Sequence, residues 1–298
     1  MGTPVLGQSE ASSPTDRSEN IDHKTVQGFG EEWAAFDQTQ FTGAEYERVF
    51  AAYFSLFPFE ELAEAEGFDL GCGSGRWAAG VASRVGFLHC IDPAEEALAV
   101  AKRRLSDQPN VDFHVASAAN IPLADGSQDF GYSLGVLHHI PDTARALADC
   151  VRKLKPGAPF LLYIYYNFEN RPAWFRAVWK TSDALRQVIC KMPFQARRGV
   201  TTILATLLYW PLARLALVAE KTGRNPSNLP LSSYRHLSFY SMRTDALDRF
   251  GTRLEQRFSR AQIKDMMERA GLTDIRFRES EPFWVACGRR SGSGAGRR

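Results

Sequence analysis

The chain has 298 residues, 44% hydrophobic and 23% charged, which is the usual mixture for a folded protein and excludes a wholly disordered or fibrous one. Its formal net charge of +2 argues against a protein that binds nucleic acid with its whole surface. The five cysteines are scattered and form no C-x-x-C pair. We therefore expect no disulfide framework and no metal site, and we expect a reducing cytoplasm.

The N-terminal part divides into two predicted segments. Residues 1–20 are rich in Ser, Thr, Pro, Glu and Gly, which predicts a disordered tail. Residues 21–66 form a predicted helical segment, because aromatic side chains from Glu45 to Phe57 recur three or four residues apart. At the other end, residues 291–298 are Gly- and Arg-rich and are predicted to be loose.

Residues 67–166 alternate between short apolar runs and helical patterns. We expect Asp92 to cap the helix that follows it. Strands separated by helices of this length predict an α/β fold with a doubly wound, mostly parallel sheet. The expected strands are residues 67–70, 87–91, 111–115, 130–134 and 159–165, and the expected helices are 76–85, 94–105 and 143–154.

The alternation stops at Asn167. Residues 167–258 contain long helical patterns and carry a local charge of +9, which leaves −7 for the rest of the chain. Residues 259–290 then resume the earlier pattern, with a helix at 260–270 and strands near 275–278 and 283–287. We predict that 167–258 form a basic, largely helical cap inserted before the last helix and strand pair and folded over the top of the sheet.

The sharpest motif is Asp69-Leu-Gly-Cys-Gly-Ser-Gly75, which stands between the first strand and the first helix of this region. Glycine is needed where the backbone turns with positive φ, or where a ligand must contact the main chain. Nineteen residues after Gly73, Asp92 ends the second strand, where a carboxylate can accept both hydroxyls of a ribose. A plain structural turn is the alternative interpretation of the glycines.

With these motifs the chain resembles the class I S-adenosylmethionine-dependent methyltransferases, in particular the branch that acts in ubiquinone and menaquinone biosynthesis. The resemblance covers about residues 67–166 and resumes from about 258 to 288. The segments that carry it are Phe68–Arg76, His89–Pro93, Asn120–Phe130, Leu134–Asp142 and Leu154–Gly157.

The resemblance implies a Rossmann-like sheet of seven strands and S-adenosyl-L-methionine as cofactor. Asp69 would hold the ammonium group and Asp92 the ribose. Ser117 stands where the family often has an Asp, and its hydroxyl would accept from the adenine amino group more weakly than a carboxylate. The residues implied to bind the cofactor are Asp69, Gly71, Cys72, Gly73, Gly75, Asp92, Pro93, Ser117, Ala118, Gly135 and Leu137.

His138 and His139 follow the fourth predicted strand, at the edge where open α/β sheets bind ligands. A neutral imidazole is a suitable base near pH 7, and we favour His139 over His138 in this catalytic role. The alternative is that both histidines have structural or positioning roles.

The cap contains an apolar run, Gly199 to Ala219, with Arg214 as its one charge. A helix buried in the cap is the first interpretation, an interfacial or lipid-contacting helix the second, and a membrane-spanning helix the third. Further along, Arg235, His236, Tyr240 and Arg249 are the candidates for acceptor binding. The alternative for these residues is an ion-pair seam in which Asp245 and Asp248 contact Arg243 and Arg249.

The sequence thus predicts an S-adenosylmethionine-dependent methyltransferase, cytoplasmic or peripheral to the membrane. Its acceptor would be a small or amphipathic molecule, phosphate-bearing or lipid-like, methylated at oxygen. One alternative is an RNA methyltransferase, which lacks support because no base-amino acceptor motif follows the fourth strand. The other is a protein that binds the cofactor without transferring its methyl group.

Overall fold

The computed structural model describes residues 20–36 and 43–292. The predicted tails therefore fall outside the described residues, except at their inner ends. Asn20 belongs to the structure: its side-chain amide donates to the carbonyl of Asp142 and accepts from the N–H of the same residue. These two bonds fix the start of the N-terminal helix against the core.

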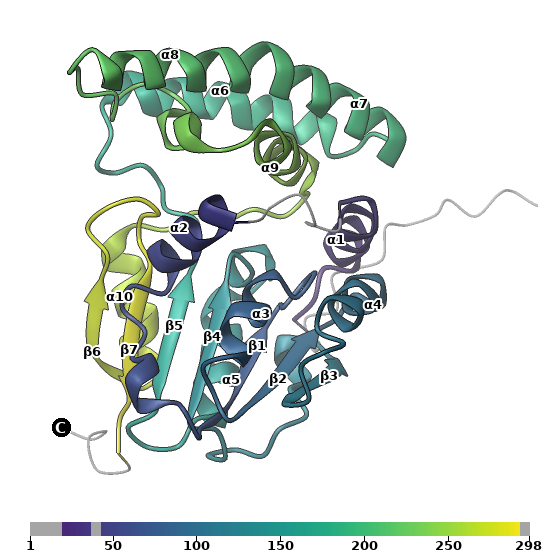
Figure 1. The fold of residues 1–298 in the computed structure, drawn as a ribbon, viewed down its shortest axis with the longest axis vertical. Helices are drawn as coiled ribbons and strands as arrows, with labels where there is room; N and C mark the ends of the chain where they lie inside the picture. Colours follow the sequence, from purple (N-terminus) through teal and green to yellow (C-terminus); the bar gives the residue numbers. More distant parts are fainter. Residues whose placement is uncertain (1–19, 37–42, 293–298) are drawn as a thin grey trace, which may run out of the picture.

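A mixed sheet of seven strands forms the centre of the molecule (Figure 1). The strand order is β3-β2-β1-β4-β5-β7-β6, and all pairs are parallel except the two that involve β7. The predicted doubly wound α/β fold is confirmed. The strands are β1 Glu66–Leu70, β2 Phe87–Asp92, β3 Val111–Val115, β4 Phe130–Leu134, β5 Pro159–Tyr163, β6 Leu272–Phe277 and β7 Ala286–Arg290.

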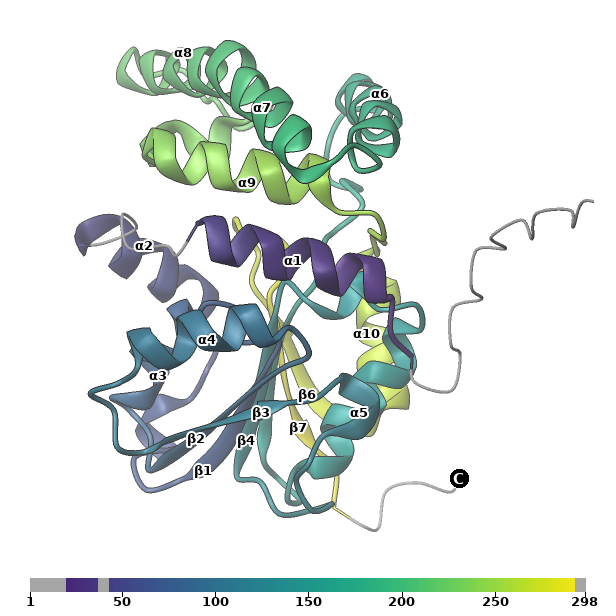
Figure 2. The ribbon, with the colours of Figure 1, turned by 90° about the vertical axis from the view of Figure 1, so that its right-hand side faces the viewer.

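Helices cover both faces of this sheet, as Figure 2 shows. On one face, α3 (Arg76–Ala82) and α4 (Glu95–Arg104) enclose a core that includes Val81, Leu98 and Tyr132. On the other face, α5 (Thr143–Lys153) and α10 (Arg260–Arg269) pack over Phe68 and Phe160. The prediction that Asp92 is the N-cap residue of α4 is wrong. The N-cap position is Ala94, and the Asp92 carboxylate accepts from the N–H groups of Gly73 and of Ala94 itself.

The N-terminal segment contains α1 (His23–Ala35), α2 (Gly43–Tyr53) and the 3-10 turn η1 (Phe59–Glu61). The second helix ends at Tyr53, four residues before the aromatic pattern does. Phe54 and Phe57 continue the pattern without the helix, since both are buried in the core beside Tyr132. Packing against the sheet, and not helical periodicity alone, therefore explains the last aromatic residues of this run.

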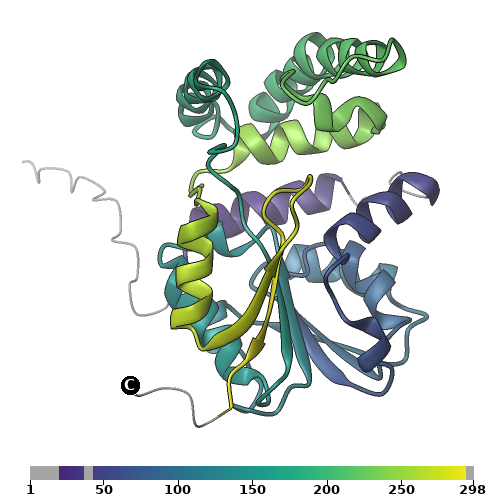
Figure 3. The same ribbon diagram turned by 90° about the vertical axis from the view of Figure 1, so that its left-hand side faces the viewer.

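The predicted cap is present as a layer of helices above the sheet (Figures 1 and 3). Its small core contains Ile189, Tyr209, Met242 and Phe250. Its two ends return to the same place, because Tyr166 and Phe258 form a parallel bridge. The elements are α6 Ala173–Ile189, α7 Phe194–Leu204, the π turn η4 Ala205–Tyr209, α8 Trp210–Lys221, the 3-10 helix η5 Ser232–His236 and α9 Phe239–Gly251.

The apolar run lies within one continuous helical stretch, Phe194–Lys221, made of α7, η4 and α8. By length and composition this stretch is the single candidate for a membrane span among the described residues. Only 22% of its most apolar window is buried inside the protein. The interpretation as a helix buried in the cap is therefore wrong, because only one ridge of the stretch is buried, against α9 and η5.

Candidate functional site

A large cavity lies at the carboxyl edge of the sheet, between the ends of β1, β2 and β4 and the helix α1. It encloses about 970 Å³ of space, its open mouth included. Of the predicted cofactor residues, Gly71, Cys72, Gly73, Asp92, Pro93, Ser117, Ala118 and Gly135 line it.

The turn after β1 brings the main chain to the wall of this cavity. Gly71 has φ +79°, and a Cβ there would lie 2.3 Å from Cγ2 of Val136, so no side chain fits. At Gly73, with φ +53°, a Cβ would lie 3.2 Å from the indole of Trp33. A bare backbone is thus required at two positions where a ligand would contact it.

Asp92 is placed at the wall of the cavity by the end of β2. Its Oδ2 accepts from the N–H of Gly73 and its Oδ1 from the N–H of Ala94, both at 2.9 Å. Burial raises the pKa of Asp92 to about 6, although these two bonds oppose the shift. Each carboxylate oxygen keeps a second lone pair, so Asp92 can still accept from two ligand hydroxyls.

Asp69 lies behind the glycine turn and does not line the cavity directly. Burial raises its pKa to about 8, although the nearby hydroxyl of Tyr132 opposes the shift, and its Oδ2 makes no hydrogen bond of good geometry within the described residues. A buried carboxylate oxygen without a partner is costly, unless a cationic ligand or a water supplies the missing donor. This orphaned atom fits the expected contact with an ammonium group.

Two other predicted cofactor residues do not reach the cavity. Leu137 is fully buried in the core beneath the loop after β4. Gly75 has φ +71°, and a Cβ there would lie 3.1 Å from Ala101 of α4, so this glycine allows α3 and α4 to pack closely. Both residues support the cavity wall instead of forming it.

Sequence reasoning missed the contribution of α1, which covers one side of the cavity. Thr25, Val26, Phe29 and Trp33 line it from this helix. Their spacing of one, three and four residues places them on one helix face, a pattern that the sequence itself contains. What the pattern lacked was any indication that this face covers a ligand site. Asn20, Ile21, Asp22, Arg76, Trp77, Val136 and Ile140 also line the cavity without having been predicted.

His139 lines the cavity, and its surroundings determine its tautomer. Its Nδ1 lies 2.6 Å from the carbonyl oxygen of Leu254, which can only accept, so Nδ1 carries the proton. Its Nε2 is left as an acceptor and has no partner within the described chain. Burial lowers the pKa of His139, which keeps the ring neutral near pH 7.

His138 differs from its neighbour in its access to the cavity. It is fully buried, it does not line the cavity, and its ring centroid lies 3.9 Å from that of Tyr165. Burial also lowers the pKa of His138 well below its ordinary value. Its position is that of a packing residue.

A row of aromatic rings leads from the cavity toward the cap. Trp77, at the cavity wall, lies 5.3 Å from Tyr53, which lies 5.0 Å from Tyr163, measured between ring centroids. Tyr165 follows at 6.0 Å from Tyr163 and contacts the His138 ring. Edge and tilted contacts of this kind form a continuous apolar wall beyond the end of β5.

The helix α9 presents two carboxylates to this wall. The hydroxyl of Tyr165 donates to Oδ2 of Asp248 at 2.7 Å. Burial raises the pKa of Asp245, one turn earlier, to about 7, while the charge of Arg76 opposes the shift. We call this boundary between core and cap the seam. The aromatic wall forms its core side, and Asp245 and Asp248 of α9 form its cap side, next to His139.

The four predicted acceptor residues lie elsewhere in the cap. Arg235 and His236 both contact Glu220, at 3.0 and 2.7 Å. Arg249 pairs with Glu255 at 3.0 Å. Tyr240 packs edge-on against Phe36, and neither described cavity is lined by any of the four. An ion-pair network is present, but with partners other than those expected, since Asp248 contacts Tyr165.

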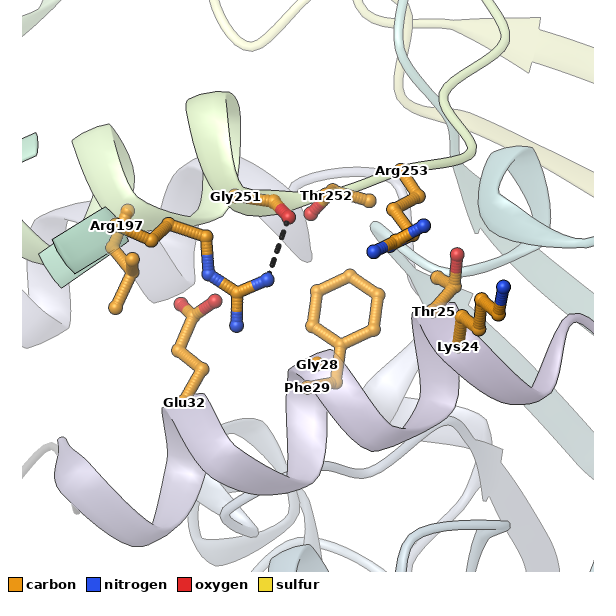
Figure 4. A pocket seen from close by; sticks show the side chains of 10 residues that line it. Lys24, Thr25, Gly28, Phe29, Glu32, Arg197, Gly251, Thr252 and Arg253 are labelled. Atoms are coloured by element: carbon orange, nitrogen blue, oxygen red, sulfur yellow. Dashed lines mark hydrogen bonds between the residues drawn. The ribbon is translucent and has the colours of Figure 1, made fainter. Parts of the chain in front are cut away.

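A narrower crevice separates α1 from the cap (Figure 4). Within the cap, Arg197 of α7 donates to the carbonyl of Gly251, and across the crevice it forms an ion pair with Glu31 of α1 at 3.1 Å. The Glu32 side chain points into the same crevice, and burial together with the charges of Asp248 and Asp245 raises its pKa well above the ordinary value. Because Thr25 and Phe29 line both spaces, α1 is the partition between the cofactor cavity and the cap.

Comparison with known proteins assigns the α/β core to a family. Residues 68–162 match the family described as a methyltransferase domain. The chain is 33% identical over 114 residues to a ubiquinone biosynthesis O-methyltransferase of Thiobacillus denitrificans, covering 38% of this chain and 47% of that one. It is also 33% identical over 100 residues to phosphoethanolamine N-methyltransferase 2 of Caenorhabditis elegans, covering 33% of this chain and 23% of that one. The matched part is less than half of either relative.

Solved structures show the same fold. A chain of the complex between the Haloferax volcanii Trm112 methyltransferase activator and a methyltransferase superposes with a TM-score of 0.50 at 17% identity, covering 88% of this chain and 98% of that one. Residues 68–162 are a methyltransferase domain, and the seven-stranded sheet as a whole has the class I S-adenosylmethionine-dependent methyltransferase fold. S-adenosylmethionine is the cofactor of this class, and the orphaned Asp69 oxygen and the bare turn at Gly71 fit it.

Proposed function

We propose that this protein transfers a methyl group from S-adenosylmethionine to an oxygen of a small or amphipathic acceptor. The cofactor supplies an activated methyl group, so the protein's task is to align the acceptor and accept its proton. The observation that carries the proposal is the unpartnered Nε2 of His139 at the wall of the cofactor cavity.

The protein's own residues divide this task. Asp69, Asp92 and the glycine turn hold the cofactor, and Gly135 leaves room beside it, since nothing lies within 4 Å of where its Cβ would be. The acceptor occupies the seam between the aromatic wall and α9. There Nε2 of His139 takes the proton from the acceptor hydroxyl, while Leu254 fixes the tautomer that makes this nitrogen the acceptor.

Methylation at oxygen needs such a base more than methylation of a neutral amine does, because a hydroxyl at pH 7 is a weak nucleophile until its proton is removed. The relatives include both an O- and an N-methyltransferase, so the choice of oxygen rests on the tautomer of His139. Asp248, bonded to Tyr165, lies close enough to favour the protonated imidazole during transfer.

The test uses methyl-labelled S-adenosylmethionine and three acceptor pools: small polar metabolites, a lipid extract and total RNA. We expect label in one of the first two pools and none in RNA. His139→Gln should lower the transfer rate about 10²- to 10⁴-fold. The affinity of this variant for S-adenosylhomocysteine should stay unchanged, because the cofactor is held by other residues.

Several results would contradict the proposal. Label in RNA would favour the nucleic-acid alternative, and no label in any pool would favour a protein that binds the cofactor without transfer. A His139→Gln variant with the wild-type rate would remove the assigned base while leaving the cofactor site intact. Asp245 is a second carboxyl at the seam, so Asp245→Asn is measured in the same assay. A larger loss of rate in Asp245→Asn than in His139→Gln would reassign the base to that carboxylate.

A further inference from the structure

The cap has an exposed apolar surface that methyl transfer does not explain. Eleven large hydrophobic side chains of the described residues are exposed, and ten of them lie on α6 or on the stretch Phe194–Lys221. We call these ten the cap outer face. They are Trp174, Val178, Leu185 and Val188 on α6, and Ile203, Leu207, Leu208, Trp210, Leu215 and Val218 on the other stretch.

The exposed residues follow helical rows and are not scattered. On α6 they are spaced by four, seven and three residues, which places them in one line along the helix. On Phe194–Lys221 a ridge from Arg197 through Tyr209 to Ala216 is buried. Each exposed residue of a second row follows a buried ridge residue by two positions, as Leu207 follows Ala205 and Val218 follows Ala216. The Leu207 side chain is 67% exposed. A helix that is apolar all round is normally buried on all sides, and this one is covered on one side only.

The charges around the cap outer face have one sign. Across residues 173–224, no acidic residue is among the exposed ones. Asp183 is bound to Arg186 and Glu220 to Arg235, so neither offers a free negative charge. The exposed charged residues of the same range are Arg176, Lys180, Lys191, Arg198, Lys221 and Arg224.

This charge pattern distinguishes the candidate partners. A two-fold dimer through this face would bring the same cations together without acids to pair them, which is unfavourable. An anionic bilayer surface supplies both the apolar interior and the negative charge, and tryptophan is enriched at that interface. Spanning is disfavoured, because the buried ridge packs on α9 and η5 and Arg214 donates to the carbonyl of Leu237 at 2.9 Å.

We infer that the cap outer face binds the surface of an anionic lipid bilayer, with α6 and Phe194–Lys221 lying in the interface. In Figures 1 and 2 these helices form the layer farthest from the sheet, with α9 beneath Phe194–Lys221. Because α9 also presents Asp245 and Asp248 to the aromatic wall, one helix layer separates the bilayer from the acceptor seam. The inference does not depend on methyl transfer, and its test does not measure it.

The experiment is flotation of the full chain with vesicles of equimolar phosphatidylcholine and phosphatidylglycerol, compared with pure phosphatidylcholine. We expect binding to the anionic vesicles, weakened by salt and reversed by carbonate washing. Leu207→Gln/Val218→Gln should lower the partition coefficient about tenfold or more. Lys180→Gln/Lys191→Gln should lower it for anionic vesicles alone. Val115→Gln is the matched control, because Val115 is 57% exposed on β3, outside the cap.

Several outcomes would overturn the inference. Wild-type protein that does not bind the anionic vesicles would contradict it. If that protein instead formed a concentration-dependent dimer that Leu207→Gln/Val218→Gln disrupts, the cap outer face would be assigned to contact with a second copy of the chain. An equal loss in Val115→Gln would mean that any exposed apolar residue has the same effect. Resistance to carbonate would indicate spanning. An unchanged affinity of each variant for S-adenosylhomocysteine shows that the fold is retained.

Discussion

Asp92 shows how one side chain serves both the fold and the ligand. Its carboxylate accepts hydrogen bonds from the N–H groups of Gly73 and Ala94, and these bonds shape the turn that would contact the cofactor. The same burial that brings it to the cavity raises its pKa to about 6. Because the folded-state pKa lies above the ordinary value of 3.8, ionising Asp92 costs stability, and its contribution to apo-protein stability declines as pH rises through about 6.

Ligand binding should show the opposite dependence on pH. An ionised Asp92 accepts two ribose hydroxyls, whereas a protonated one has given up an acceptor position. The affinity for S-adenosylhomocysteine, measured by calorimetry, should therefore rise as pH increases through about 6. Asp92→Asn should weaken binding about 100-fold at pH 8, since hydrogen bonds to a charged group contribute about 1.5–3 kcal/mol each.

The matched control is Asp112→Asn, an exposed acid on the neighbouring strand β3, which should leave the affinity unchanged. The change of S-adenosylhomocysteine affinity with pH near pH 6 should also disappear in Asp92→Asn. If that slope persisted in the variant, another group would be titrating and the assignment to Asp92 would be wrong.

Among the secondary-structure elements, α1 is the part of the site that the sequence motifs do not mark. It is anchored by Asn20 at its start and by its own cap, in which the Asp22 side chain accepts from the N–H of Thr25. Trp33 extends from it to Gly73, and Phe29 contacts the ring of His139 at 5.1 Å. The helix therefore closes the cofactor cavity and joins it to the seam with the cap.

Removing one ring from this helix should test its covering role. Trp33→Ala should weaken binding of S-adenosylhomocysteine about tenfold. The indole is half-buried, and losing its contact with the ligand costs on the order of 1–2 kcal/mol of binding free energy. The measurement is titration followed by intrinsic fluorescence. Trp174→Ala, in which the lost ring is 49% exposed on α6, serves as the control and should bind normally. Equal affinity in wild type and Trp33→Ala would show that α1 does not cover the ligand.

In the molecule as a whole, the core and the cap meet at the seam that we assign to the acceptor. The cap contributes the Leu254 carbonyl to His139 and Asp248 to Tyr165. The two ends of the insertion are bonded to each other, since Asn167 donates to the carbonyl of Phe258 and Phe258 to that of Tyr165. The sheet therefore does not need the cap in order to close.

This connectivity predicts the result of excising the cap. A chain in which a short Gly-Ser linker replaces residues 168–256 should still bind S-adenosylhomocysteine within about tenfold of the full chain, because every strand and the glycine turn remain. It should show no methyl transfer, since the seam has lost one wall. Transfer at the wild-type rate by the excised protein would place the acceptor site outside the seam, and loss of folding would show that the cap supports the core.

The sheet, the glycine turn and the position of Asp92 could be predicted from the sequence, because they depend on local patterns: alternating strands and helices, positive-φ glycines and a carboxylate at a strand end. The predicted strand ends at Val111 and Val115, and at Phe130 and Leu134, agree with the structure for this reason. Three further properties required the folded chain: the face of α1 that covers the cavity, the free nitrogen of His139, and the ion pairs that occupy Arg235 and Arg249. Such properties depend on partners far away in the chain, such as Leu254 for His139, and no local pattern records a distant partner.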